Sequence, residues 1–296
     1  MIEPATALLV ARITFNLGAL LLWGGSACLL LIVDPSLRDV LWQRLRFWGL
    51  IAAGLAWLAT LTALPTLTAS IGSGWEAASS LRMLTLVVTK TMVGHAWVWQ
   101  LGSMLVLTVV LVVAALRRPM GVGMASALML ATLTVSGHTA MHEGITGTLH
   151  RLNDWGHLLA GGFWLGALVP VVMLLGQLRE PSMRAGAIRA LIRFSSVGHL
   201  AVALGVLTGM ANTWLVVGGW PLEPGALYQR ALWLKVVLVG LLMIMALYNR
   251  YRLVPRLSRE AGALEALRRV SIAEIMILIS VVALVSWFGT LSPGYG

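Results

Sequence analysis

Histidine is the residue type whose positions in this sequence point most directly to chemistry. The chain has six His among 296 residues. Once the expected helices are drawn, five of them lie towards one side of the protein, and these are His95, His138, His142, His150 and His157. Imidazole is the commonest metal ligand and a costly side chain to leave unpaired within a membrane. Their grouping predicts a metal or proton site on that side.

The spacing of these residues adds to the signal. At 100° per residue, His150, Asp154 and His157 fall on one face of a helix. His138 and His142 have the i, i+4 spacing of a helical face. The same segment, GHTAMHEGITGTLHRLNDWGH, also contains Met141. Imidazole nitrogens beside a carboxylate or a thioether suit copper, and a carboxylate can instead orient a ligating imidazole. The alternative is that these His residues are polar caps hydrogen-bonded to loop backbone.

Four further residues could form a path through the protein: Met210, His199, Lys235 and Glu274. Met210 lies 11 residues beyond His199, so the two share a helix face about 16 Å apart. Lys235 and Glu274 are ionisable groups within apolar segments, which makes them candidate functional residues by default. The alternatives are core filling for Met, and long side chains that reach the membrane interface for the charged residues.

The composition defines the elements that must hold these side chains. Hydrophobic residues make up 59% of the chain and charged residues 11%, against about 25% charged in soluble domains. Runs such as LVLTVVLVVAAL do not alternate as strands of a membrane barrel do. We predict an all-α polytopic membrane bundle of eight transmembrane helices in a single integral domain, residues 1–296. The expected helices cover residues 7–33, 47–70, 91–116, 119–142, 151–178, 194–218, 231–254 and 271–292.

The basic residues predict the orientation of the bundle. Alternate connections hold 15 of the 21 Lys and Arg residues, Arg259 among them, and such residues stay on the cytoplasmic side. Both termini are therefore expected to be periplasmic, with the first apolar run retained as a helix. The net charge of +10 then reflects topology and contact with anionic membrane lipids, not nucleic acid. The Gly-rich segment LLAGGFWLGALVP suggests a tightly packed central helix.

Several function classes can be set aside. The sequence has no HExxH, GxSxG, Walker A or CxxC motif, so we expect no enzyme. A single cysteine, Cys28, excludes an internal disulfide. A transporter without ATP hydrolysis would move its ion down a gradient, or couple it to protons or to a partner. Two alternatives stay open: a haem-binding electron carrier, with His95 or His138 facing His157, and a sensor or assembly factor that binds copper without passing it.

The segment GHTAMHEGITGTLHRLNDWGHLLAGGFWLGALVPV resembles the signature of the copper resistance protein D family. RFSSVGHLAVALGVLTGMANTW and the Leu-Lys-Val of LWLKVVLVGLLMIMALYNRYRLVPRL are similar to later stretches of that family. The resemblance implies a multi-pass protein of the bacterial inner membrane that moves copper, as Cu(I) or Cu(II), from the periplasm towards the cytoplasm. It also implies a small periplasmic copper-binding partner of the C type. By motif, four positions carry over: His138, His150, His157 and His199. His95 and His142 depend on geometry alone.

Overall fold

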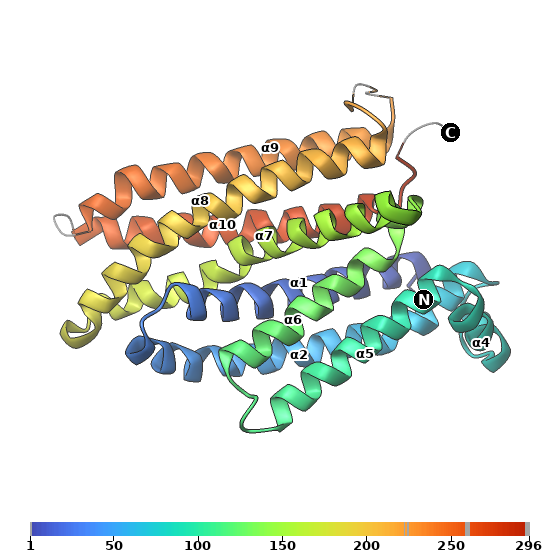
Figure 1. Ribbon diagram of the computed structural model, residues 1–296, viewed down its shortest axis with the longest axis horizontal. Coiled ribbons are helices and arrows are strands. Elements are labelled where there is room, and N and C mark those ends of the chain that lie inside the picture. The colour runs from blue at the N-terminus through green and yellow to red at the C-terminus, as the bar shows by residue number, and fades with distance from the viewer. Residues whose placement is uncertain (1, 222, 224, 258–260, 294–296) are drawn as a thin grey trace.

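The protein is a bundle of long helices (Figure 1). The computed structural model describes residues 2–221, 223, 225–257 and 261–293, and these contain no strand. The α-helices are α1 (Pro4–Leu31), α2 (Pro35–Ile71), α3 (Trp75–Ala78), α4 (Leu81–Lys90), α5 (Met92–Val112), α6 (Pro119–Thr132), α7 (Gly144–Gln177), α8 (Pro181–Val217), α9 (Leu227–Tyr248) and α10 (Ala261–Phe288). Short turns of other helix types are η1 (Leu133–Val135), η2 (Gly137–Met141), η3 (Asn249–Leu253) and η4 (Val254–Arg256).

The helices have the length and composition of membrane spans. Within the described residues, seven are long and apolar enough to cross a bilayer, and a shorter apolar helix covers Pro119–Val135. The predicted all-α polytopic bundle is confirmed. The start of α1 and the end of α10 lie at the same end of the bundle (Figure 1), as an even number of crossings requires. The count of eight, the periplasmic placement of the termini and the single domain stay predictions.

Three helices begin ten or more residues earlier than predicted. They start at residue 35 instead of 47, at 181 instead of 194, and at 261 instead of 271. The reason is physical: an uncharged stretch marks only the part of a helix that lies in lipid, whereas the helix itself continues into water as polar turns. Two of the three, α2 and α8, open on proline at the first helical position, where proline suits a helix start. Arg259 lies outside the described residues.

The predicted helix 119–142 is wrong in its second half. The regular helix α6 ends at Thr132, and two 3₁₀ turns follow. Gly137, between those turns, has a φ of 78°, which glycine adopts readily because it has no Cβ. His138 and His142 therefore do not share a helix face. The next helix, α7, begins at Gly144. Most of residues 143–150, which were predicted to connect the two helices, are therefore helical.

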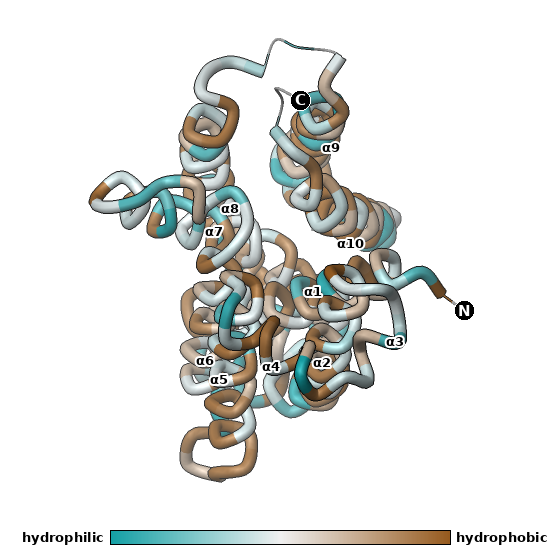
Figure 2. Tube along the Cα trace, turned by 90° about the vertical axis from the view of Figure 1, so that its right-hand side faces the viewer, coloured by the Kyte–Doolittle hydropathy of each residue, from teal (hydrophilic) through white to brown (hydrophobic). Residues whose placement is uncertain are grey.

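The centre of the bundle is a close crossing of α1 and α7, which lie between α8, α9 and α10 on one side and α2, α5 and α6 on the other (Figure 2). A Cβ added to Gly24 on α1 would lie 2.0 Å from the Gly162 carbonyl oxygen on α7, and one added to Gly166 would lie 2.6 Å from the Leu20 carbonyl oxygen. Small residues let the two backbones approach. The predicted tight packing of the Gly-rich segment is confirmed.

Arginine side chains tie the α1–α2 turn to α8 at one end of the bundle, which we call the arginine end. Arg189 Nη2 donates to Asp34 Oδ2 at 2.9 Å, and Arg193 donates to Asp34 Oδ1. Arg193 and Arg38 also donate to backbone carbonyl groups at the end of α1, which the helix itself leaves without partners. Charge-assisted hydrogen bonds therefore join α1, α2 and α8 at this end.

The arginine end makes stability depend on pH. The hydrogen bonds from Arg193 and Arg189 hold the pKa of Asp34 below its ordinary value. The stabilising contribution is complete above that ordinary value, about 4, and is lost as the pH falls through the folded-state pKa. We expect Asp34→Asn to lower the thermal unfolding midpoint in detergent at pH 7, and the difference from the parent to shrink as the pH falls below about 4. Asp39→Asn, at an exposed position on α2, is the control. An equal effect of both variants contradicts this assignment.

Candidate metal centre at the histidine end

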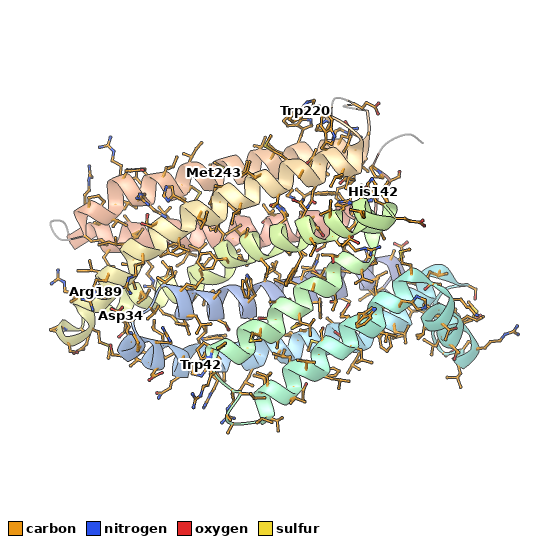
Figure 3. The ribbon with its side chains drawn as sticks, viewed as in Figure 1. Asp34, Trp42, His142, Arg189, Trp220 and Met243 are labelled. Atoms are coloured by element: carbon orange, nitrogen blue, oxygen red, sulfur yellow. The ribbon has the colours of Figure 1, made fainter. Side chains whose placement is uncertain are left out.

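His142 lies at the opposite end of the bundle from Asp34 and Arg189 (Figure 3). We call this the histidine end. The side chains that meet there come from η2, α7, α8 and α9. The site therefore needs elements from both halves of the chain.

Two imidazole rings are in contact at this end. His142 Nδ1 lies 3.2 Å from His150 Nδ1, and the ring centroids are 5.3 Å apart at an interplanar angle of 68°. One nitrogen of such a pair carries the hydrogen and the other accepts it. His150 on α7 is fully buried, with 0% of its surface exposed. Its second nitrogen, Nε2, is buried without a hydrogen-bond partner in the described part of the chain.

His138 lies beside this pair. Its ring meets the ring of Tyr228 edge to face, with centroids 5.3 Å apart, and Tyr228 meets Phe288 in the same way at 5.2 Å. Burial lowers the pKa of His138, which favours the neutral imidazole that a metal ion requires. Its Nε2 is also buried without a partner among the described residues. Buried polar atoms are normally paired, so His138 and His150 hold unused ligand atoms in one region.

One helical turn further into the bundle, Asp154 joins α7 to α8. Asn212 Nδ2 donates to Asp154 Oδ1 at 2.8 Å. Asn153 Nδ2 donates to Asn212 Oδ1 at 2.7 Å, which fixes the orientation of the Asn212 amide. The ammonium group of Lys235 on α9 interacts electrostatically with the Asp154 carboxylate. Asp154 is therefore held by two neighbouring helices and has a cation as its partner.

His157 completes the row of polar residues on α7. Its Nδ1 lies 3.0 Å from the Gly205 carbonyl oxygen and 3.1 Å from Thr208 Oγ1 on α8. A carbonyl oxygen only accepts, so Nδ1 carries the hydrogen and the neutral ring keeps a lone pair on Nε2. Gly209 makes room for the ring, since a Cβ there would lie 3.1 Å from His157 Cε1. This is the tautomer in which Nε2 can bind a metal.

Two of the predicted residues at this end lie outside the buried group. His95 is exposed on α5, and its Nε2 lies 3.3 Å from the Thr89 carbonyl oxygen. Its described hydrogen bond is therefore with the end of α4 and not with α7. Met141 in η2 is 56% exposed, next in sequence to His142. Its side chain therefore lies at the protein surface.

The predicted path residues are more scattered. Met210 is 49% exposed on α8. His199 is also exposed, and its Nδ1 lies 3.0 Å from Arg250 Nη1. Lys235 lies beside Asp154, as described above. Glu274 is only 2% exposed and lies 13 residues into α10, about 20 Å from the start of that helix. The Glu274 side chain therefore lies among the helices, and its place on a path through the protein stays a prediction.

The described residues form no complete metal cluster. Within residues 2–221, 223, 225–257 and 261–293, no three His, Cys, Asp or Glu side chains are placed to hold one ion. The His142 and His150 rings are in contact, and His138 lies near them. The predicted copper site therefore stays a prediction. The haem alternative requires His157 to face His95 or His138 across a haem. It gains no support, because the described hydrogen bonds of His157 and His95 are with α8 and with Thr89.

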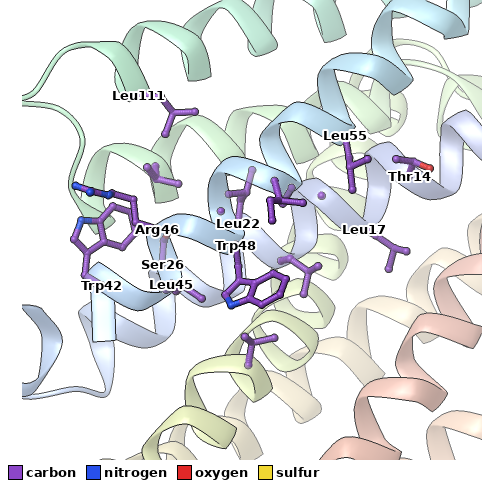
Figure 4. Close-up of a pocket in the computed structure, with 17 residues that line it drawn as sticks. Thr14, Leu17, Leu22, Ser26, Trp42, Leu45, Arg46, Trp48, Leu55 and Leu111 are labelled. Carbon is purple, nitrogen blue, oxygen red and sulfur yellow. The ribbon is translucent and has the colours of Figure 1, made fainter. Parts of the chain in front are cut away.

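A groove elsewhere in the bundle does not supply ligands. It has a volume of about 410 Å³ and is lined mainly by apolar side chains of α1 and α2, with Trp42, Arg46 and Trp48 among them (Figure 4). Its lining contains no imidazole, carboxylate or thiol. The groove therefore lacks the side-chain ligands that a copper ion prefers.

Sequence reasoning missed Tyr228 and Asn153 as parts of the site. Tyr228 precedes Lys235 by seven residues, two helical turns, so the two share a face of α9. That spacing was the available signal. Asn153 adjoins Asp154, but only the contact with Asn212 on α8 distinguishes it from a surface amide.

The fold and the site together define a class: a multi-pass helical membrane protein in which imidazole nitrogens without a partner among the described residues are buried at one end of the bundle. A family model for the N-terminal domain of copper resistance protein D-like proteins matches residues 1–148, and the copper resistance protein D model matches residues 188–288. The chain belongs to the copper resistance protein D family, as the resemblance of its motifs implied.

Three relatives agree with this assignment. Inner membrane protein YebZ of Escherichia coli is 34% identical over 74% of this chain and 72% of its own length. Copper resistance protein D of Pseudomonas syringae is 33% identical over 70% of this chain and 71% of its own. Copper transport protein CutJ of Bacillus subtilis is 26% identical over 75% of this chain but 42% of its own. The protein is thus a multi-pass inner-membrane protein with a copper-related function, and these names describe transport and resistance instead of catalysis.

The fold also has a likeness among solved structures. The bd oxidase from Geobacillus thermodenitrificans aligns with a TM-score of 0.51 at 10% identity, over 99% of this chain and 88% of that one. At this identity the likeness concerns the helical arrangement alone.

Proposed function

We propose that this protein carries copper ions across the inner membrane, from the periplasm towards the cytoplasm, and that the ion enters at the histidine end. The observation that supports this most is the presence of two buried Nε2 atoms, of His138 and His150, that no described group pairs. An unpaired polar atom in an apolar interior costs free energy. A bound cation removes that cost.

The surroundings suit a soft cation in a dry site. His138 has its pKa lowered by burial, so it is neutral at pH 7, and His142 can serve as a third ligand or orient His150. Met141, exposed beside them, offers a thioether that suits Cu(I). We propose that a small periplasmic copper-binding protein of the C type delivers the ion to this side.

Further into the bundle from the histidine end, we propose that His157 is the next binding site and that it binds the ion through Nε2. Asp154 lies between His150 and His157 on α7, so a cation that moves from one imidazole to the other passes its carboxylate. Met210, His199, Lys235 and Glu274 are kept as candidates for the remaining path.

The test is copper binding by the purified protein in detergent. We expect the triple variant His138→Ala, His150→Ala, His157→Ala to lose copper binding, and His142→Ala to bind about 10–100-fold more weakly if His142 only orients His150. His95→Ala is the matched control, since it removes an exposed imidazole elsewhere in the protein. An unchanged stoichiometry in the triple variant refutes the proposed site.

Transport needs a second measurement, because a sensor would also bind copper. Copper uptake into proteoliposomes is expected for the parent and the His95→Ala variant, and is expected to be absent for the triple variant. Binding without uptake by the parent would assign the protein to a sensing or assembly role instead.

A further inference from the structure

A glutamate and an asparagine side chain face each other in the interior, away from the histidine end. Glu274 on α10 is 2% exposed, and Asn249, the first residue of η3, is 9% exposed. Asn249 Nδ2 donates to Glu274 Oε2 at 3.2 Å. The contact links α10 to the end of α9, in the half of the bundle nearer the arginine end.

The two remaining oxygens of this pair are unpaired. Asn249 Oδ1 and Glu274 Oε1 are both buried and have no hydrogen-bond partner among the described residues. An amide oxygen and an ionised carboxylate oxygen can only accept, so neither can satisfy the other. A proton on Oε1 changes this, because the neutral carboxyl group can donate to Oδ1 while it accepts from Nδ2. Both orphan atoms are then satisfied in one cyclic acid–amide pair.

No described charge compensates an ionised Glu274. On α9 and η3 the nearest charged groups are Arg250, whose Nη1 donates to the Ser195 carbonyl oxygen and Oγ, and Arg252. On α10 itself Glu265, Arg268 and Arg269 lie towards the exposed start of the helix. On α1 the ionisable side chain in the inner half is the buried thiol Cys28, and α7 has none between His157 and its end. A buried carboxylate without a cation is costly, and protonation removes the cost.

The local backbone is adapted to this pair. Asn249 begins a π-helical turn at the end of α9, and such turns occur frequently at functional sites. In this turn Asn249 contacts α10, whereas the next residue, Arg250, contacts Ser195 and His199 on α8. In this turn, two polar residues that are adjacent in sequence therefore contact different helices.

We propose that Glu274 is a proton-binding site and that Asn249 is its positioning residue. In the resting protein the proton lies on Oε1 and is shared with Asn249 Oδ1. Release of this proton as a cation passes would couple copper movement to proton movement. That coupling rests on the proposed function, whereas the proton on Glu274 does not.

Infrared spectroscopy of the metal-free, full-length protein tests the site. We expect a carbonyl stretching band of a hydrogen-bonded, protonated carboxylic acid at pH 7. Glu274→Gln, which keeps the cyclic pairing without an acid, is expected to remove this band and to leave the unfolding midpoint unchanged. Glu265→Gln, at an exposed position on the same helix, and Asp154→Asn, at the other buried acid, are the controls and are expected to retain it.

A second variant keeps the proposal testable if Glu274→Gln does not fold. Asn249→Leu removes the partner but not the acid, so the band is expected to shift to higher frequency, as for a carboxyl group without a hydrogen bond. The absence of the band from the parent, or its presence in Glu274→Gln, overturns the proposal. A protein with the band but without copper uptake refutes the proposed transport alone.

Discussion

Replacement of Gly24 by alanine is expected to prevent the normal packing of α1 against α7. The added Cβ would lie 2.0 Å from the Gly162 carbonyl oxygen and 2.7 Å from the Gly166 Cα. Both are backbone atoms, so no side-chain rotation relieves the clash and the helices must separate. Overpacking costs about 1–3 kcal/mol where side chains can adjust, and we expect at least the upper value here. Unfolding of the purified protein in detergent measures the loss.

The matched control for Gly24→Ala lies in the same crossing. Gly161→Ala on α7 adds the same methyl group next to Gly162, but at an exposed position with no atom within 4 Å. It is expected to leave stability unchanged or to raise it slightly, because alanine favours helix over glycine by about 1 kcal/mol. Equal unfolding curves for the two variants would show that the α1–α7 crossing is not closely packed. Copper binding by Gly24→Ala is expected to fall as well, since α7 carries His150 and His157.

Removal of the Lys235 charge is expected to destabilise the site more than removal of both charges. Lys235→Met leaves the carboxylate of Asp154, held between α7 and α8 by Asn212, without the cation that faces it. Loss of one partner of a direct buried ion pair costs about 3–5 kcal/mol, whereas replacement of both by neutral groups is often close to neutral. Asp154 and Lys235 attract each other electrostatically without a direct salt bridge, so we expect a smaller loss here. The double variant Asp154→Asn, Lys235→Met is therefore expected to recover most of the stability.

A double-mutant cycle over the four proteins measures this coupling directly. Asp154→Asn alone is expected to cost less than Lys235→Met, because the lysine side chain is long enough to move its ammonium group towards the interface. Lys90→Met, at an exposed position on α4, controls for the loss of a lysine as such. Additive effects of the two substitutions would show that Asp154 and Lys235 do not form a pair.

The parts of the site that lie on one continuous helix could be predicted from the sequence. His150, Asp154 and His157 are spaced i, i+4 and i+7, and α7 is helical throughout this segment. The helical repeat is a local property, so it places these residues on one side without knowledge of any other element. For the same reason the Gly-rich part of α7 could be recognised as a close-packing surface.

Where the chain leaves the regular helix, the prediction was wrong. His138 and His142 have helical spacing, but Gly137 adopts a positive φ and the segment is a 3₁₀ turn. A search for uncharged stretches does not reveal this, because the segment is as free of Asp, Glu, Lys and Arg as the helix before it. His95 shows a different limit: it belongs to the same side of the membrane as the other histidines, but its helix directs it to Thr89 instead of to the imidazole pair.

Hydropathy, family motifs and the helical period are properties of short segments. They were therefore enough to identify an all-α inner-membrane protein of the copper resistance protein D family and the residues of α7 that share a face. Which helices meet depends on the folded chain as a whole. The tertiary structure brought Tyr228 to His138, Asn212 to Asp154 and Asn249 to Glu274. These contacts join residues far apart in the chain, and they arise because buried polar atoms in a bilayer must find partners on neighbouring helices.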